Sequence, residues 1–305
     1  MIFSQQVFWL IFSVFILGAV VFDLYFWGRH KHEFSLKEAG LWTLIWIGLS
    51  LFFNLLIYLY MGQVKALEYL TAYVLEKSLS LDNLFVFLII FSYFDLPLNS
   101  QRKVLKLGIL GAFVLRAVFI FGGIWLLGEF DFLFYIFGAF LIYSGIKLIF
   151  QKSERRVDPQ KSFFIRLVRK IAPFDDACKV DFFSKNTGKL CLTPLFITLL
   201  LIEGSDLVFA LDSVPAVLAI SRDPFIAYTS NAFAILGLRA FYFFLVGFLP
   251  KFVYLKTGVM ILLIFIGLKM ILSQHFHIPI YFSLIFILMT LFLAALFSIL
   301  KNRKT

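Results

Sequence analysis

The chain has 305 residues, of which 62% are hydrophobic and only 15% are charged, and its mean hydropathy is +0.95. This composition excludes an ordinary soluble domain and predicts a protein that crosses a membrane several times. Lys and Arg facing an anionic membrane surface account for the net charge of +10, so no nucleic acid partner is needed.

Hydropathy divides the chain into nine candidate membrane spans of about twenty residues, the length that crosses about 30 Å of hydrocarbon. They cover residues 7–27, 40–61, 67–94, 104–126, 132–150, 192–220, 226–249, 256–273 and 280–300. These stretches are too long and too uniformly apolar to be barrel strands. We therefore predict an all-α polytopic membrane protein with a single transmembrane domain over residues 1–305. The first span lacks a basic leader and a cleavage site, so we expect it to be retained.

The distribution of basic residues predicts the orientation. With the N-terminus outside, the inner loops and the C-terminal tail contain 21 Lys and Arg residues, whereas the outer loops contain only Lys65 and Arg222. The positive-inside rule then places the N-terminus outside and the C-terminus in the cytoplasm. The longest inner loop is the basic segment 151–190, in which residues 162–170 fit either a helix on the membrane surface or a solvated loop.

An internal repeat links the two halves of the chain. LSLDNLFVF (79–87) aligns with FALDSVPAV (209–217), FVLRAVFIF (113–121) with ILGLRAFYF (235–243), and SGIKLI (144–149) with IGLKMI (266–271). We define repeat A as residues 63–150 and repeat B as residues 191–273, with spans three to five and six to eight respectively. Because each repeat has an odd number of spans, the second copy is expected to be inverted, as in many secondary transporters.

Charged residues recur at matching positions of the two repeats. The alignment superposes Glu76 on Asp206, Asp82 on Asp212, Arg116 on Arg239 and Lys147 on Lys269. A charge at the bilayer centre costs on the order of 3 kcal/mol, so these groups need compensating partners. The candidate cation ligands are Glu76, Asp82, Asn83, Glu203, Asp206, Asp212 and Ser213, and the candidate charge partners and gates are Arg116, Arg239, Lys147 and Lys269. The alternative is an ion-pair network that only holds helices together.

Helix geometry limits how these acids can share one ion. Glu76 and Asp82 are six residues apart, so an unbroken helix points them in different directions. Glu203 and Asp206 are three residues apart and can face the same ion. Pro215 removes one backbone hydrogen bond, which predicts a kinked or locally unwound sixth span.

The available ligand atoms indicate the class of ion. Carboxylate, amide and hydroxyl oxygens suit magnesium, calcium or manganese(II), and they do not distinguish these ions from one another or from a proton relay. The four histidines lie in predicted loops, and the two cysteines form no metal or redox motif, so we expect no zinc, copper or thiol chemistry. These residues are His30, His32, His275, His277, Cys178 and Cys191.

Three stretches resemble the signatures of the TerC family of integral membrane proteins. They are EKSLSLDNLFVF (76–87), EGSDLVFALDSVPA (203–216) and TSNAFAILGLRAFYF (229–243), and YIFGAFL (135–141) and HIPI (277–280) are similar to its Alx-type members. The resemblance implies a bacterial inner-membrane protein linked to manganese(II) efflux and, by the family's name, to tellurium resistance. The resemblance also implies that the acidic positions of the family correspond to Glu76, Asp82, Glu203, Asp206 and Asp212.

The predicted function is export of a hard divalent cation, with manganese(II) favoured, from the cytoplasm by proton-coupled alternating access. We expect no enzyme activity and no bound cofactor; the partners are the transported ion and the lipid bilayer, and the oligomeric state stays open. Two alternatives are a membrane docking or signalling protein in metal or tellurite stress, and a carrier for another cation or for an oxyanion such as tellurite. An intramembrane hydrolase fits less well, because the LDN and LDS aspartates lack the tyrosine-aspartate and GxGD patterns of aspartyl examples.

Overall fold

The computed structural model describes residues 5–29, 36–130, 132–150, 181–186, 189–246, 254–272, 276 and 278–302. Its elements are α1 (Gln5–Arg29), α2 (Leu36–Met61), α3 (Gln63–Tyr93), α4 (Leu98–Glu129), α5 (Leu133–Phe150), β1 (Phe183–Asn186), β2 (Lys189–Leu192), α7 (Pro194–Leu218), α8 (Pro224–Leu236), α9 (Leu238–Leu245), α10 (Leu255–Leu272) and α11 (Ile280–Asn302). The predicted all-α fold class is confirmed.

Several of the described helices can cross a membrane. Four of them, α2, α4, α7 and α11, are long and apolar enough to do so, and shorter apolar stretches lie in α1, α5, α8 and α10. Helix α3 has 31 residues but carries Glu76, Lys77 and Asp82 near its middle, so it suits a position inside the bundle better than one facing lipid. The chain is therefore a multi-pass membrane protein, and the number of nine spans stays a prediction.

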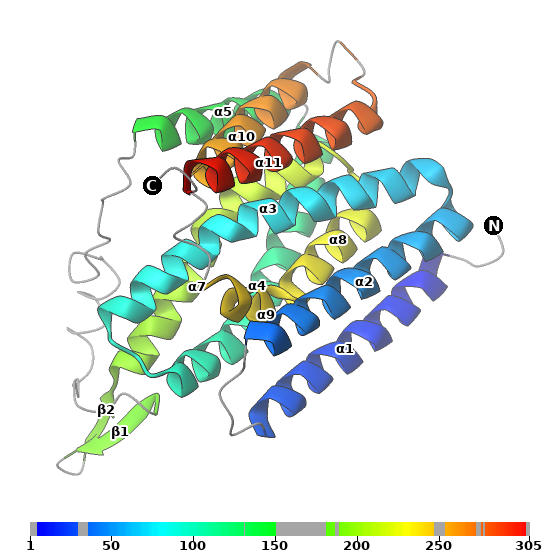
Figure 1. Ribbon diagram of the computed structural model, residues 1–305. Coiled ribbons are helices and arrows are strands. Elements are labelled where there is room, and N and C mark those ends of the chain that lie inside the picture. Colours follow the sequence, from blue (N-terminus) through cyan, green and yellow to red (C-terminus); the bar gives the residue numbers. More distant parts are fainter. Residues whose placement is uncertain are drawn as a thin grey trace.

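Helices α3, α4, α7 and α8 form the centre of the bundle (Figure 1). Helix α3 packs against α8, and α4 packs against α7. Helices α5, α10 and α11 lie together on one side of this centre, while α1 and α2 lie on the opposite side (Figure 1). The predicted acids and Arg116 thus lie on helices at the centre, whereas Lys147, Lys269 and Arg239 lie on α5, α10 and α9.

The predicted sixth span begins with a β-hairpin instead of helix. Strands β1 and β2 pair antiparallel, with Ser184 opposite Cys191. Thr193 ends the hairpin and caps α7, because its hydroxyl accepts a hydrogen bond from the amide of Phe196 at 3.4 Å. Pro194 follows at the start of the helix, where its fixed φ is favourable and no amide donor is required. Residues 192 and 193 therefore do not belong to the helix as predicted.

The predicted seventh span consists of two helices. Helix α8 ends at Leu236, and α9 begins at Leu238 after a break at Gly237. A Cβ atom at Gly237 would lie 3.0 Å from Cβ of Trp46 and 3.1 Å from Nζ of Lys77. The break therefore occurs where the backbone passes close to a bulky and a charged neighbour. Hydropathy alone could not detect it, because both halves are equally apolar.

Glycines bring α5 and α10 into close contact. A Cβ atom at Gly138 would lie 2.8 Å from the carbonyl oxygen of Gly267, and a Cβ atom at Gly267 would lie 2.6 Å from that of Gly138. Small residues let membrane helices approach in this way and gain van der Waals contact. The third helices of the two repeats therefore pack backbone to backbone.

We expect Gly267→Leu to destabilise the protein by about 1–3 kcal/mol or more, because the added side chain would overlap the backbone of α5. The measurement is thermal unfolding of the purified protein in detergent. Gly122→Leu on α4 is the matched control, because no atom lies within 4 Å of a Cβ atom there. Equal melting temperatures for the two variants would contradict the proposed packing.

Candidate functional site

Four helices contribute to a buried polar cluster at the centre of the bundle. Glu76 of α3 is fully buried and forms an ion pair with Arg116 of α4. Asn231 of α8 donates a hydrogen bond to Oε2 of Glu76 at 3.2 Å and accepts one from Arg116 at 2.6 Å. Arg116 also donates to Oγ of Ser213 on α7 at 3.4 Å. The ion pair of Glu76 with Arg116 lies within repeat A, and the hydrogen bonds to Asn231 and Ser213 connect it to repeat B.

Asp206 of α7 extends this cluster and is 5% exposed. Asn83 of α3 donates a hydrogen bond to Oδ1 of Asp206 at 3.4 Å. Asp206 also interacts electrostatically with Arg116 and with Glu203. Arg116 therefore serves acids from both repeats, Glu76 from the first and Asp206 from the second.

Glu203 lies one turn before Asp206 and faces α4. Its carboxylate occupies the space that a side chain at Gly111 would need. A glycine at this position of α4 lets an acidic group lie directly against the helix backbone. The sequence gives no reason to single out Gly111 until the two helices are seen together.

A cavity of about 230 Å³ adjoins the cluster. Its lining includes Glu76, Asn83, Arg116, Ser144, Lys147, Asp212 and Ser213. Asp212 is partly buried, accepts a hydrogen bond from Ser144 of α5 at 2.7 Å and interacts electrostatically with Lys147. The cavity thus combines carboxylate, amide and hydroxyl oxygens with two cationic side chains.

Not every predicted residue joins this cavity. The backbone of Asp82 belongs to α3, but its side chain lies outside the described part of the structure. Arg239 is buried beside Asp206 in a smaller cavity. Lys269 lines a separate cavity near the end of α10. Among the described side chains, no group of three His, Cys, Asp or Glu residues could hold a metal ion.

Helices α3 and α7, which are the first helices of repeats A and B, remain helical through the acidic segments. Local unwinding of the sixth span is not seen, because α7 continues to Leu218 with Pro215 inside its last turn; a kink at this proline stays a prediction. Pro215 has no amide hydrogen to donate to the carbonyl oxygen of Leu211. Helix α3 is also unbroken from Gln63 to Tyr93.

Two polar residues of the cavity region are absent from the predicted set. Asn231 bridges Glu76 and Arg116, and Ser144 donates to Asp212. Ser144 and Asn231 are polar residues within apolar spans, and that is the signal which could have identified them. Their partners lie on other helices, so sequence spacing alone does not reveal the contacts.

Lys77 stabilises the break between α8 and α9. Its ammonium donates to the carbonyl oxygen of Ala234 at 3.2 Å and lies 5.1 Å from the centre of the Phe241 ring. The C-terminal end of a helix carries partial negative charge, which favours a cation at this place. Lys77 therefore faces away from its neighbour Glu76 and acts on the helix break instead of the acidic cluster.

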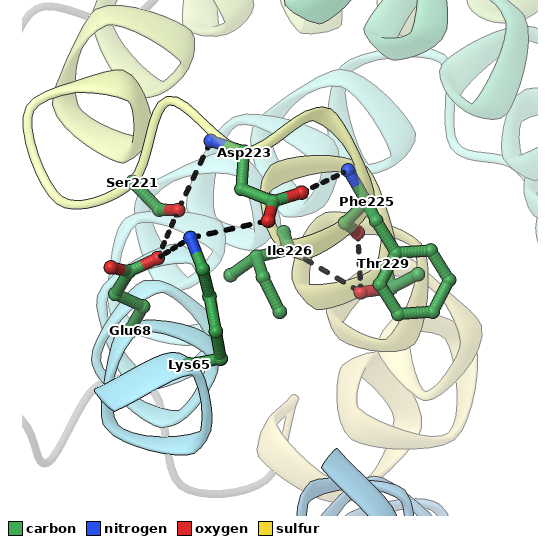
Figure 2. A network of polar contacts seen from close by, with 7 residues as sticks. All are labelled: Lys65, Glu68, Ser221, Asp223, Phe225, Ile226 and Thr229. Carbon is green, nitrogen blue, oxygen red and sulfur yellow. Dashed lines mark hydrogen bonds and ion pairs between the residues drawn. The ribbon is translucent and has the colours of Figure 1, made fainter. Parts of the chain in front are cut away.

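A second polar network joins α3 to the turn between α7 and α8 (Figure 2). Lys65 contacts Oε2 of Glu68 at 3.0 Å and Oδ2 of Asp223 at 3.1 Å. Ser221 donates to the same oxygen of Glu68, and Asp223 caps α8 by accepting from the amide of Phe225 at 3.0 Å. We call these residues the α3–α8 latch: Lys65, Glu68, Ser221 and Asp223. The latch holds the first helix of one repeat to the second helix of the other.

Comparisons with a family model and with similar proteins both indicate a membrane protein. The family model described as "Integral membrane protein TerC family" matches residues 61–305. A protein of Escherichia coli K12 named "Putative membrane-bound redox modulator Alx" is 43% identical over 282 residues, which cover 90% of this chain and 88% of the relative. An uncharacterized membrane protein of Myxococcus xanthus is 41% identical over 299 residues, or 97% of this chain and 92% of the relative. No solved structure matches.

Proposed function

Because the chain belongs to the TerC family of integral membrane proteins, we propose that it exports a hard divalent cation, with manganese(II) as the favoured substrate. The observation that carries this proposal is the central cavity, where Glu76 of one repeat and Asp212 of the other line the same space. A membrane protein that buries acids at such a place needs a cationic partner for them. The cavity is large enough to admit a partly hydrated ion.

The chemistry of the lining residues favours a hard ion. Asn83, Ser144 and Ser213 add amide and hydroxyl oxygens to the two carboxylates. Such oxygens suit manganese(II), magnesium and calcium, whereas zinc and copper sites use nitrogen and sulfur. Among the described lining residues there is no His and no Cys. Manganese(II) is preferred among hard ions on the family resemblance.

Arg116 acts in this proposal as a tethered cation that neutralises the site when it is empty. Its contact with Glu76 and its attraction to Asp206 compensate two buried acids. An incoming divalent ion competes with the guanidinium for the same carboxylates. Metal binding therefore requires Arg116 to move away from Glu76 and the acids to approach one another, since the described side chains do not already form a metal site.

Alternating access is the proposed route across the membrane. The packing pattern supports a two-fold relation between the repeats: α3 packs against α8, α7 packs against α4, and α5 packs against α10. Rocking of one repeat against the other would expose the cavity to each side in turn. The α3–α8 latch (Figure 2) contains Lys65, and Arg222 lies between its members Ser221 and Asp223 in the sequence. The predicted orientation puts Lys65 and Arg222 outside, so the latch would close the outer side and must open for release.

The proposed setting is the bacterial inner membrane, with the N-terminus outside and the C-terminus in the cytoplasm. The excess of Lys and Arg in the inner loops supports this orientation. With this orientation the ion enters from the cytoplasm and leaves outward. We propose protons as the counter-substrate, because a carboxylate can hold either a proton or a metal ion.

The relatives' printed name suggests a redox role as the second candidate. A direct thiol reaction has few groups available, since the sequence contains two cysteines, and Cys191 is a buried residue of β2. Cys178 lies outside the described residues. We therefore favour cation export as the activity of this chain.

The test is manganese(II) uptake into inverted membrane vesicles that contain the full-length protein. In such vesicles the cytoplasmic face points outward, so export appears as uptake. We expect uptake to rise when the interior is made acidic and to fall when the gradient is collapsed. Magnesium and calcium are measured in parallel to define the ion. If correctly folded protein moves none of the three ions, transport is refuted and the docking or signalling alternative gains support.

A further inference from the structure

A second cavity of about 350 Å³ lies away from the acidic site, near the end of α10 and the start of α11. Its lining includes Leu218, Arg222, Lys269 and Phe134. It has room for roughly ten water molecules at about 30 Å³ each. A tetrahedral oxyanion with part of its hydration shell therefore fits inside.

The cationic groups of this cavity are only partly compensated. Lys269 is 7% exposed, and its ammonium forms no hydrogen bond or ion pair with any described residue. Arg222 contacts the face of Phe134, with its guanidinium carbon 4.0 Å from the ring centre, and no described carboxylate pairs with it. A buried ammonium without a hydrogen-bonded partner is costly, so an anion that enters the cavity would gain a favourable interaction with it.

The described acid that interacts with Lys269 already has other partners. Glu68 interacts electrostatically with Lys269 without forming an ion pair. Its Oε2 accepts hydrogen bonds from Lys65 and Ser221 of the α3–α8 latch. The position of Lys269 in the last turn of α10 supplies some further stabilisation through the helix dipole. Neither feature supplies hydrogen-bond acceptors for the ammonium.

We propose that this cavity binds a phosphate-type oxyanion between Lys269 and Arg222. Arg presents planar paired donors that match oxyanion geometry, and Lys adds a point charge. The oxyanion has two available sources, which are free phosphate in solution and the headgroup phosphate of a phospholipid. The exposed ring of Phe276, which also lines the cavity, is placed to contact lipid in the second case. This site is independent of cation transport.

The first arm of the test is equilibrium dialysis of radiolabelled phosphate against the purified protein in phosphatidylcholine nanodiscs. We expect saturable binding that excess chloride displaces poorly, and a loss of affinity of about tenfold or more in Lys269→Met and in Arg222→Met, which corresponds to about 1.4 kcal/mol. Lys103→Met is the matched control, because it removes a lysine paired with Asp181 elsewhere in the chain. Removing a buried charge is not expected to unfold the protein, so loss of binding in Lys269→Met would indicate the loss of the binding site and not of the fold.

The second arm uses nanodiscs that contain phosphatidylglycerol, with bound lipid counted by native mass spectrometry. Phosphate binding that needs Lys269 and Arg222 identifies a free oxyanion as the ligand. Retention of phosphatidylglycerol that needs both residues, without phosphate binding, identifies a lipid headgroup. If both variants match the wild-type protein in both arms, the cavity is not an oxyanion site, and Lys269 serves only to balance Glu68.

Discussion

Glu76→Gln is expected to reduce manganese(II) uptake by about 100-fold or more, which corresponds to about 3 kcal/mol. Glu76 is the acid through which Arg116, Asn231 and the central cavity are connected. The amide keeps the shape of the side chain but removes the charge that attracts a cation. Uptake into inverted vesicles measures the effect, and Glu129→Gln at the exposed end of α4 is the control.

The same substitution leaves Asp206 as the remaining buried acid near Arg116, and losing the paired carboxylate costs up to about 3–5 kcal/mol. A second variant separates this folding effect from transport. In Glu76→Gln with Arg116→Met both charges are gone, so thermal stability is expected to recover at least in part. Transport is expected to remain lost, because the carboxylate is still missing. Recovery of uptake together with stability would show that Glu76 has only a structural role.

The helical fold class could be predicted from hydropathy because the lipid environment restricts which structures an apolar segment can form. Long apolar stretches must form helices in lipid, where backbone groups have no water to bind. The hairpin of β1 and β2 escaped prediction because its residues lie almost entirely in the predicted loop 151–190, where hydropathy does not indicate secondary structure. The break at Gly237 escaped prediction because the residues on both sides of it are apolar, and the deciding contacts, such as Lys77 against Ala234, come from distant parts of the chain.

The sequence predicts which charged residues belong to the candidate site, but it does not predict which of their side chains lie together. The repeat identified Arg116 as a partner for intramembrane acids, and the structure pairs it with Glu76. The repeat also suggested equivalent roles for Lys147 and Lys269. The structure separates them: Lys147 lines the central cavity with Asp212, whereas Lys269 lines the cavity beside Arg222. The alignment of the two repeats shows which positions correspond, but the neighbouring helices determine which residues each side chain contacts.

Asp212→Asn is expected to abolish proton-driven manganese(II) uptake while the protein remains folded. Asp212 is only partly buried, and its main contact is the hydrogen bond from Ser144. An asparagine oxygen can accept the same bond, so we expect thermal stability to change by less than about 1 kcal/mol. The loss of the carboxylate removes a group that could hold either the ion or a proton.

Ser144→Ala is the control that separates the effect of the Asp212 charge from the effect of its hydrogen bond to Ser144. It removes the hydrogen bond to Asp212 but leaves the charge, so we expect weaker uptake with the response to the pH gradient retained. A complete loss in both variants would indicate that the geometry around Ser144, and not the charge of Asp212, limits transport. Unchanged uptake in Asp212→Asn would instead show that the Asp212 carboxylate is not needed for transport. The acids left to bind the ion would then be those around Arg116, which are Glu76 of the first repeat and Asp206 of the second.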